Sequence, residues 1–125
     1  MSRRNSIFGV VLAVFLLSLP QMALAADSGL ISKPSKYSVP ETIQRFEAAV
    51  KAKGYIIFTE IDHAAAAAKF GLESRPRTVV VFGDPKNGTA RLQKAPTLAI
   101  DAPPKALVWQ DDQARSGSLI TRPNT

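Results

Sequence analysis

The sequence predicts an α+β fold, a two-layer sandwich in which a small mixed or antiparallel sheet packs on two or three short helices. Apolar residues between positions 43 and 50 recur at the spacing of one helix face. Three runs rich in β-branched and aromatic residues, at 55–61, 77–82 and 105–109, are typical of strands. Strands and helices follow one another without the strict alternation of a parallel α/β fold, which favours two mixed layers.

The first half of the domain is expected to contain a short strand and the main helix. The strand covers residues 30–33. The helix begins behind Ser38, which stands three residues before Glu41 in the capping-box pattern. Gly54 is expected to end this helix, because glycine readily takes the positive φ found after a helix C-terminus.

The middle of the chain predicts a short helix and a buried strand. Asp62 offers a side-chain oxygen as the cap of an alanine-rich helix over residues 63–70, which Gly71 ends. The strand at 77–82 is almost wholly apolar, and this predicts burial on both of its faces.

The last part of the domain begins with the turn signal of residues 83–88. We expect a short helix over residues 89–94, capped by Thr89. The strand at 105–109 then leads into a hairpin turn that begins at Asp111.

The N-terminus has the pattern of an export signal. Two arginines at positions 3 and 4 precede an apolar run over residues 7–19, and the small residues Ala23 and Ala25 form a cleavage site. The apolar run is shorter than the roughly 20 residues that a membrane-spanning helix needs. We therefore expect residues 1–25 to be a cleaved signal peptide. The mature chain would be soluble, without an integral membrane segment, and periplasmic or secreted.

Composition excludes several kinds of chemistry. The chain has no cysteine and a single histidine, His63, which rules out thiol catalysis, cysteine-ligated metal clusters and a multi-histidine metal site. We expect no metal and no cofactor. The formal charge of +6 falls to +4 when the two leader arginines are removed, and the remaining charges are scattered. Nucleic acid is not an expected partner, because no basic stripe is interleaved with aromatic residues.

Two motifs suggest an anion-binding groove. Residues 83–88 match G-x-x-x-x-G after a strand, but the lysine and hydroxyl residue of a phosphate loop do not follow, so we predict a plain turn rather than a nucleotide site. Arg75 stands where the buried strand begins and could recognise a carboxylate or phosphate. His63 opens the alanine-rich helix, where it could act as a base or form one structural hydrogen bond. The candidate ligand contacts are His63, Arg75, Asp84, Lys86 and Thr89.

Several sequence blocks resemble one bacterial family. Residues 34–39 read PSKYSV, 42–49 read TIQRFEAA, 58–65 read FTEIDHAA and 81–89 read VFGDPKNGT. Together they are similar to the Domain of Unknown Function 302 family, and the resemblance extends from Leu30 to about Gln113. The resemblance implies a small α+β domain that is often secreted and dimeric. It implies no activity.

The C-terminus departs from this family pattern. Related sequences continue after Asp-Asp-Gln with a strand of the type Gly-Lys-Val-Trp-Leu and a further helix, whereas residues 114–125 here read ARSGSLITRPNT. We hypothesise a one-base deletion at Gln113, either real or a sequencing error. The domain over 26–113 would then be incomplete, the strand at 105–109 would lie at an unpaired edge, and residues 114–125 would be a disordered, out-of-frame tail.

The expected function is that of a non-catalytic binding or interaction module. We expect a groove near His63, Arg75 and the turn at 83–88 to hold a small or anionic ligand. The family resemblance adds a homodimer as an expected partner. One alternative is a hydrolase or lyase that uses His63 as its base, although no nucleophile or metal set accompanies it. The other alternative is a truncated remnant without a molecular function.

Overall fold

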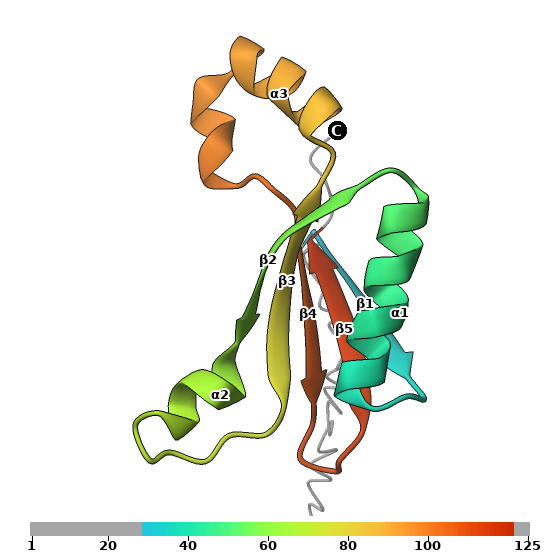
Figure 1. Ribbon diagram of the computed structural model, residues 1–125, viewed down its shortest axis with the longest axis vertical. Coiled ribbons are helices and arrows are strands. Elements are labelled where there is room, and N and C mark those ends of the chain that lie inside the picture. The colour runs from blue at the N-terminus through green and yellow to red at the C-terminus, as the bar shows by residue number, and fades with distance from the viewer. Residues whose placement is uncertain (1–28, 122–125) are drawn as a thin grey trace, which may run out of the picture.

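A computed structural model describes residues 29–121, and these residues form one five-stranded antiparallel sheet with the strand order β1-β5-β4-β3-β2 (Figure 1). The predicted α+β class is confirmed. The leader expected over residues 1–25 lies outside the described residues. The strands are β1 (Leu30–Ser35), β2 (Ile56–Asp62), β3 (Arg77–Gly83), β4 (Lys105–Gln110) and β5 (Ser116–Thr121). The helices are α1 (Val39–Ala52), α2 (His63–Ala68), α3 (Pro85–Lys94) and the 3-10 helix η1 (Pro96–Ile100).

Helix α1 forms the second layer, and the signals that predicted it are confirmed. The Ser38 hydroxyl accepts the N–H of Glu41 at 3.3 Å, which satisfies one of the free donors of the first turn. Gly54 follows the C-cap with φ of 85°, a conformation that glycine adopts without steric cost. The apolar side of α1 packs on the sheet, where the rings of Phe46 and Phe82 meet edge to face at 5.0 Å.

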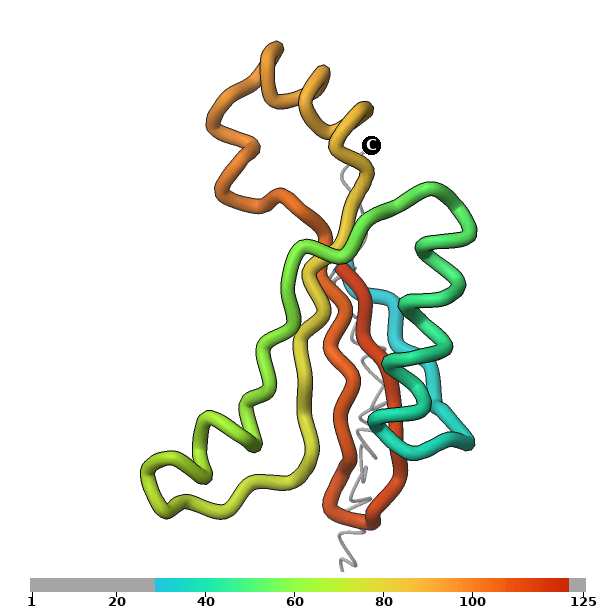
Figure 2. The backbone as a smooth tube through the Cα atoms, in the orientation of Figure 1, coloured from blue at the N-terminus to red at the C-terminus, as the bar shows by residue number. Residues whose placement is uncertain are grey.

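The register of the strands assigns each side chain to one of two sheet faces. Phe82, Ala106 and Ile120 point toward α1 and belong to the core that Val50 closes. Residues one position along each strand point to the opposite face. Among the described residues α1 is the helix that lies across the sheet, while α2 and the α3–η1 segment lie near its two ends (Figures 1 and 2). No described helix therefore lies across the opposite face.

The prediction of a disordered tail is wrong for the part that the structure describes. Ser116–Thr121 forms β5, which pairs with β4 on one side and β1 on the other, so β4 is not an unpaired edge. The hairpin turn is held by Asp111, whose Oδ1 accepts the N–H groups of Gln113 and Arg115, each at 2.9 Å. These hydrogen bonds lower the pKa of Asp111, and the bond from the Arg115 backbone has the largest effect. Leu119 and Ile120 point to opposite faces of the sheet, so β5 places one apolar side chain on each face.

Two element boundaries also differ from the sequence prediction. Helix α3 begins at Pro85 rather than at residue 89, because Asp84 caps it and proline suits the first helical turn. Residues 83–88 are therefore a strand end followed by the first helical turn, and Gly88 lies inside the helix. Helix α2 ends at Ala68, two residues earlier than predicted, and Gly71 follows with φ of 69°.

Candidate functional site

The structure separates the predicted ligand contacts into two groups. His63 and Arg75 lie near the end of the sheet where β2 finishes and β3 begins. Asp84 and the α3 residues Lys86 and Thr89 follow the opposite end of β3. The seven residues of β3 separate the groups by about 20 Å, at roughly 3.3 Å per residue. The single groove expected from the sequence is therefore wrong.

His63 is the first residue of α2 and is exposed. The predicted cap of this helix is confirmed, because Asp62 Oδ1 accepts the N–H of Ala65 at 2.9 Å. No hydrogen bond between His63 and a hydroxyl, carboxylate or guanidinium group is found among the described residues. The geometry does not assemble His63 with a nucleophile, so its role as a base stays a prediction.

Arg75 is occupied by a structural contact. Its Nε lies 3.3 Å from Oδ1 of Asp112, and its Nη2 donates to the Asp112 carbonyl at 3.2 Å. The guanidinium thereby ties the segment before β3 to the β4–β5 hairpin. The Arg75 side chain is 44% exposed and the Asp112 side chain fully exposed, so the ion pair contributes little to stability.

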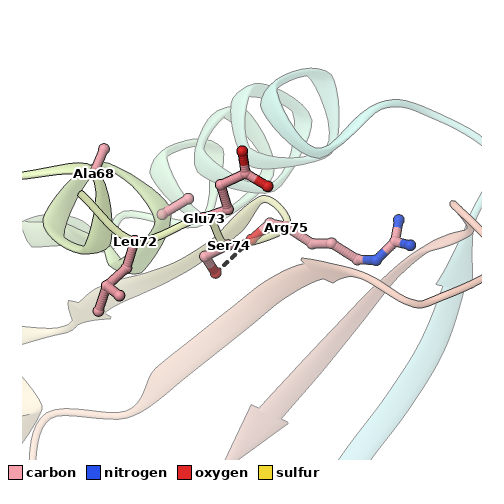
Figure 3. A pocket seen from close by; sticks show the side chains of 6 residues that line it. Ala68, Leu72, Glu73, Ser74 and Arg75 are labelled. Atoms are coloured by element: carbon pink, nitrogen blue, oxygen red, sulfur yellow. Dashed lines mark hydrogen bonds between the residues drawn. The ribbon is translucent and has the colours of Figure 1, made fainter. Parts of the chain in front are cut away.

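An open hollow lies beside α2, with a volume of about 590 Å³. Figure 3 shows its lining, in which Arg75 points away from Ala68 and Leu72. The Ser74 hydroxyl donates a hydrogen bond to the Arg75 carbonyl at 3.1 Å. The lining is formed by Ala64, Ala68, Leu72, Glu73, Ser74 and Arg75. The hollow joins a small apolar wall to one carboxylate and one paired arginine, without a set of groups suited to acid–base or nucleophilic chemistry.

Asp84 has the role of a helix cap. Its Oδ1 accepts the N–H groups of Lys86 at 3.0 Å and Asn87 at 3.3 Å, and its other oxygen accepts the side-chain amide of Asn87. The carboxylate thus occupies the N-terminus of α3, where an anion would otherwise bind. Lys86 and Thr89 are exposed on the helix that Asp84 caps.

A pair of carboxylates lies where α1 meets β2, and the sequence analysis missed it. A hydrogen bond with Glu47 raises the pKa of Glu60, and burial raises it further. Glu47 Oε1 is buried without a hydrogen-bond partner, while Lys51 pairs with Oε2 at 3.3 Å. A proton on Glu60 can supply the missing donor. No sequence signal links them, because one lies on a helix and the other on an edge strand.

The second face of the sheet carries a group of apolar side chains that no described helix covers. Trp109 lies on this face over Gly117, where a Cβ atom would come within 3.2 Å of the indole. Ile61 is 45% exposed and Leu30 is 40% exposed, although both belong to strands of the sheet. We call the following residues the apolar sheet face: Leu30, Phe58, Ile61, Val79, Val81, Leu107, Trp109 and Leu119.

The centre of the apolar sheet face carries no charge. Arg77 pairs with Trp109 at one end of the sheet, and Lys105 pairs with Val81 at the other, so the basic side chains lie at the rim. Thr59 and Thr121 lie on the same rim, and the Thr121 hydroxyl bonds the Lys105 backbone. Trp109 lies beside Arg77 at one end of the face, and the centre is aliphatic. An apolar centre, an aromatic residue and a polar rim are usual components of a protein–protein interface.

Residues 29–121 contain no group of three or more histidine, cysteine, aspartate or glutamate residues placed to hold a metal ion. Within the same residues no helix is long and apolar enough to cross a membrane.

The chain is similar to curated proteins that are about twice as long. It is 39% identical over 116 residues to "Fluoride-specific ion channel FluC 1" of Brucella suis biovar 1 (strain 1330), which covers 93% of this chain and 46% of the relative. The same identity and coverage of this chain are found with "Fluoride-specific ion channel FluC 2" of Brucella melitensis biotype 1 (strain ATCC 23456 / CCUG 17765 / NCTC 10094 / 16M), with 43% of the relative covered. This chain therefore spans less than half the length of these relatives.

A solved structure shares the fold. It is the crystal structure of an uncharacterised conserved protein DUF302 from Bacillus stearothermophilus, with a TM-score of 0.71 and 18% sequence identity. The similarity covers 77% of this chain and 75% of that one. The family model described as "Domain of unknown function DUF302" matches residues 31–124. The resemblance inferred from the sequence blocks is thus confirmed, and the chain belongs to the DUF302 family.

Proposed function

We propose that this chain is a non-catalytic interaction module, and that it pairs with a second copy of itself through the apolar sheet face. The observation that carries the proposal is an open face with Trp109 beside the half-buried Leu107 and Leu119. Exposed apolar residues are normal when scattered singly, but a contiguous group with a polar rim is typical of a binding surface.

The size and charge of the face are compatible with an identical partner. Five strands about 4.8 Å apart and six residues at about 3.4 Å each give a face of roughly 20–24 Å by 20 Å. This area of about 400–480 Å² is roughly half of the about 800 Å² that each partner buries in a standard interface, so the rim side chains must take part in the contact as well. Two such sheets pack face to face about 10 Å apart, as in a β-sandwich. The uncharged centre meets no like-charge repulsion from a second copy.

We also propose that the module acts outside the cytoplasm. The support is the leader pattern, with two arginines, the apolar run at residues 7–19 and the Ala23–Ala25 cleavage site. Sequencing the N-terminus of the purified mature protein tests this, since export predicts Ala26 as its first residue.

The test of the dimer is sedimentation equilibrium of the purified mature chain over a wide concentration range. We expect a dimer that the double substitution Leu30→Glu/Ile61→Glu converts to a monomer with an unchanged circular dichroism spectrum. Both residues are 40–45% exposed on edge strands, so the isolated monomer should tolerate the change. A matched control is Phe70→Glu/Leu72→Glu, which alters two more exposed residues in the loop after α2 and should leave the dimer intact.

A second candidate partner comes from the comparison. The Brucella relatives combine a domain similar to this chain with about as much further sequence, under the name of a fluoride channel. We propose as the alternative that the apolar sheet face contacts a membrane channel of this kind. A chain that remains monomeric at high concentration but binds such a channel, and loses that binding with Leu30→Glu/Ile61→Glu, would favour the alternative over the dimer.

A further inference from the structure

One segment projects from the fold at the end opposite to α2. We call residues 85–100, which comprise α3 and η1, the arm (Figure 2). Helix α3 packs chiefly against η1, and neither element has a buried residue. A helix of ten residues is marginally stable alone, so an arm with so little packing behind it gains from a surface on which to rest.

The charge of the arm is of one sign. It contains Lys86, Arg91 and Lys94 but no aspartate or glutamate from Pro85 to Ile100. Two acidic residues flank the arm: Asp84 before it, which accepts hydrogen bonds from the backbone of the first turn, and the exposed Asp101 directly after Ile100. With Lys86, Arg91 and Lys94 against these two, the balance remains basic. The surface that complements the arm is therefore negatively charged.

The arm also presents apolar side chains. Ile100 is 84% exposed and Leu98 is 37% exposed, both on the short η1 helix. On α3, Gly88 and Leu92 are half-buried and four residues apart, so they lie on the side of the helix that faces the rest of the molecule. Lys86 and Lys94 are exposed. The arm therefore carries exposed basic residues and exposed aliphatic ones on the same segment, and this combination favours binding at the interface of an anionic bilayer.

We propose that the arm docks this domain on membranes that contain anionic phospholipids. The exposed lysines contact the lipid phosphates, and Ile100 with Leu98 enters the boundary between headgroups and acyl chains. This contact uses other residues than the apolar sheet face, so it does not depend on the proposed dimer.

The experiment is co-sedimentation of the purified mature chain with vesicles of phosphatidylcholine alone and with 30–40% phosphatidylglycerol added. Each basic residue near an anionic surface strengthens binding by about fivefold, so Lys86→Gln/Lys94→Gln should weaken binding to the anionic vesicles by about 25-fold. The matched control is Lys36→Gln/Lys69→Gln, which removes the same charge from exposed positions at the other end of the molecule. It should weaken binding by no more than about twofold.

Ile100→Ser tests the apolar part of the contact. It should weaken binding by several-fold at salt concentrations that screen the lysines. Two results would overturn the proposal. One is equal affinity for both kinds of vesicle, and the other is an equal loss in the arm variant and its charge-matched control.

Discussion

Gly117 provides a direct test of whether the C-terminal segment is a strand. A Cβ atom at this position would lie 3.2 Å from Cη2 and 3.3 Å from Cζ2 of Trp109, closer than such contacts normally are. It would also lie 3.5 Å from the Lys33 carbonyl oxygen on β1. The substitution Gly117→Val must therefore push the indole away from the sheet. Overpacking of this kind costs about 1–3 kcal/mol.

Urea unfolding followed by fluorescence measures this cost, because Trp109 is the only tryptophan of the chain. With a dependence of about 1–3 kcal/mol per molar urea, the unfolding midpoint should fall by about 1 M. Gly117→Ala should have a smaller effect, because alanine needs a shift of only a few tenths of an ångström and restricts the unfolded chain.

Gly88→Ala is the matched control for the glycine substitution. Nothing lies within 4 Å of the Cβ position of Gly88, which is inside α3, so alanine should be neutral or stabilising by up to about 1 kcal/mol. If Gly117→Val leaves the unfolding midpoint unchanged, residues 116–121 do not form β5. The expectation of a disordered tail would then be restored.

Two further predictions concern single positions. The raised pKa of Glu60 means that its protonated form is favoured in the folded state, so folding stability should fall as the pH rises from about 4.5 through that pKa. Glu60→Gln should stabilise the protein at pH 7 by a few tenths of a kcal/mol, measured as a higher melting temperature, and should weaken the dependence of stability on pH. The control Glu73→Gln should change neither the melting temperature nor its pH dependence. A melting temperature that rises with pH in this range in the native protein would contradict the raised pKa of Glu60. Ala114 has φ of 59°, which costs a residue with a Cβ atom about 1 kcal/mol, so Ala114→Gly should stabilise the hairpin by about that amount in the same urea assay. A loss of stability instead would show that residue 114 is not in the left-handed conformation.

The fold could be predicted where one local signal decides the structure. Ser38 and Gly54 set the ends of α1, and the runs at 55–61, 77–82 and 105–109 were placed within a residue or two of β2, β3 and β4. In contrast, Ser116–Thr121 has small polar residues at its start and no clear alternation, so β5 could not be recognised from composition. Strand β5 forms because it pairs with two neighbouring strands and because Gly117 leaves room for the Trp109 ring to pack on it.

The candidate site was harder to predict, because it depends on tertiary placement. Arg75 and Asp84 lie only nine positions apart in sequence, but the extended strand between them takes them to opposite ends of the sheet. The same limit applies to Glu47 and Glu60, which come together only when α1 packs beside β2. The apolar sheet face likewise emerges only from the register of five strands.

The two outer strands restrict how copies of this molecule can meet. On β1, Pro34 has no N–H to donate, and Lys33 adds a charge to the same edge. On β2, a bulge between Ile57 and Thr59 interrupts the ladder, and the acidic Glu60 and Asp62 follow it. Neither edge is a good template for another strand, so the sheet resists sideways growth into a longer ribbon. A molecule built in this way can form a closed pair by stacking, and the open-ended polymers of edge-to-edge pairing are disfavoured.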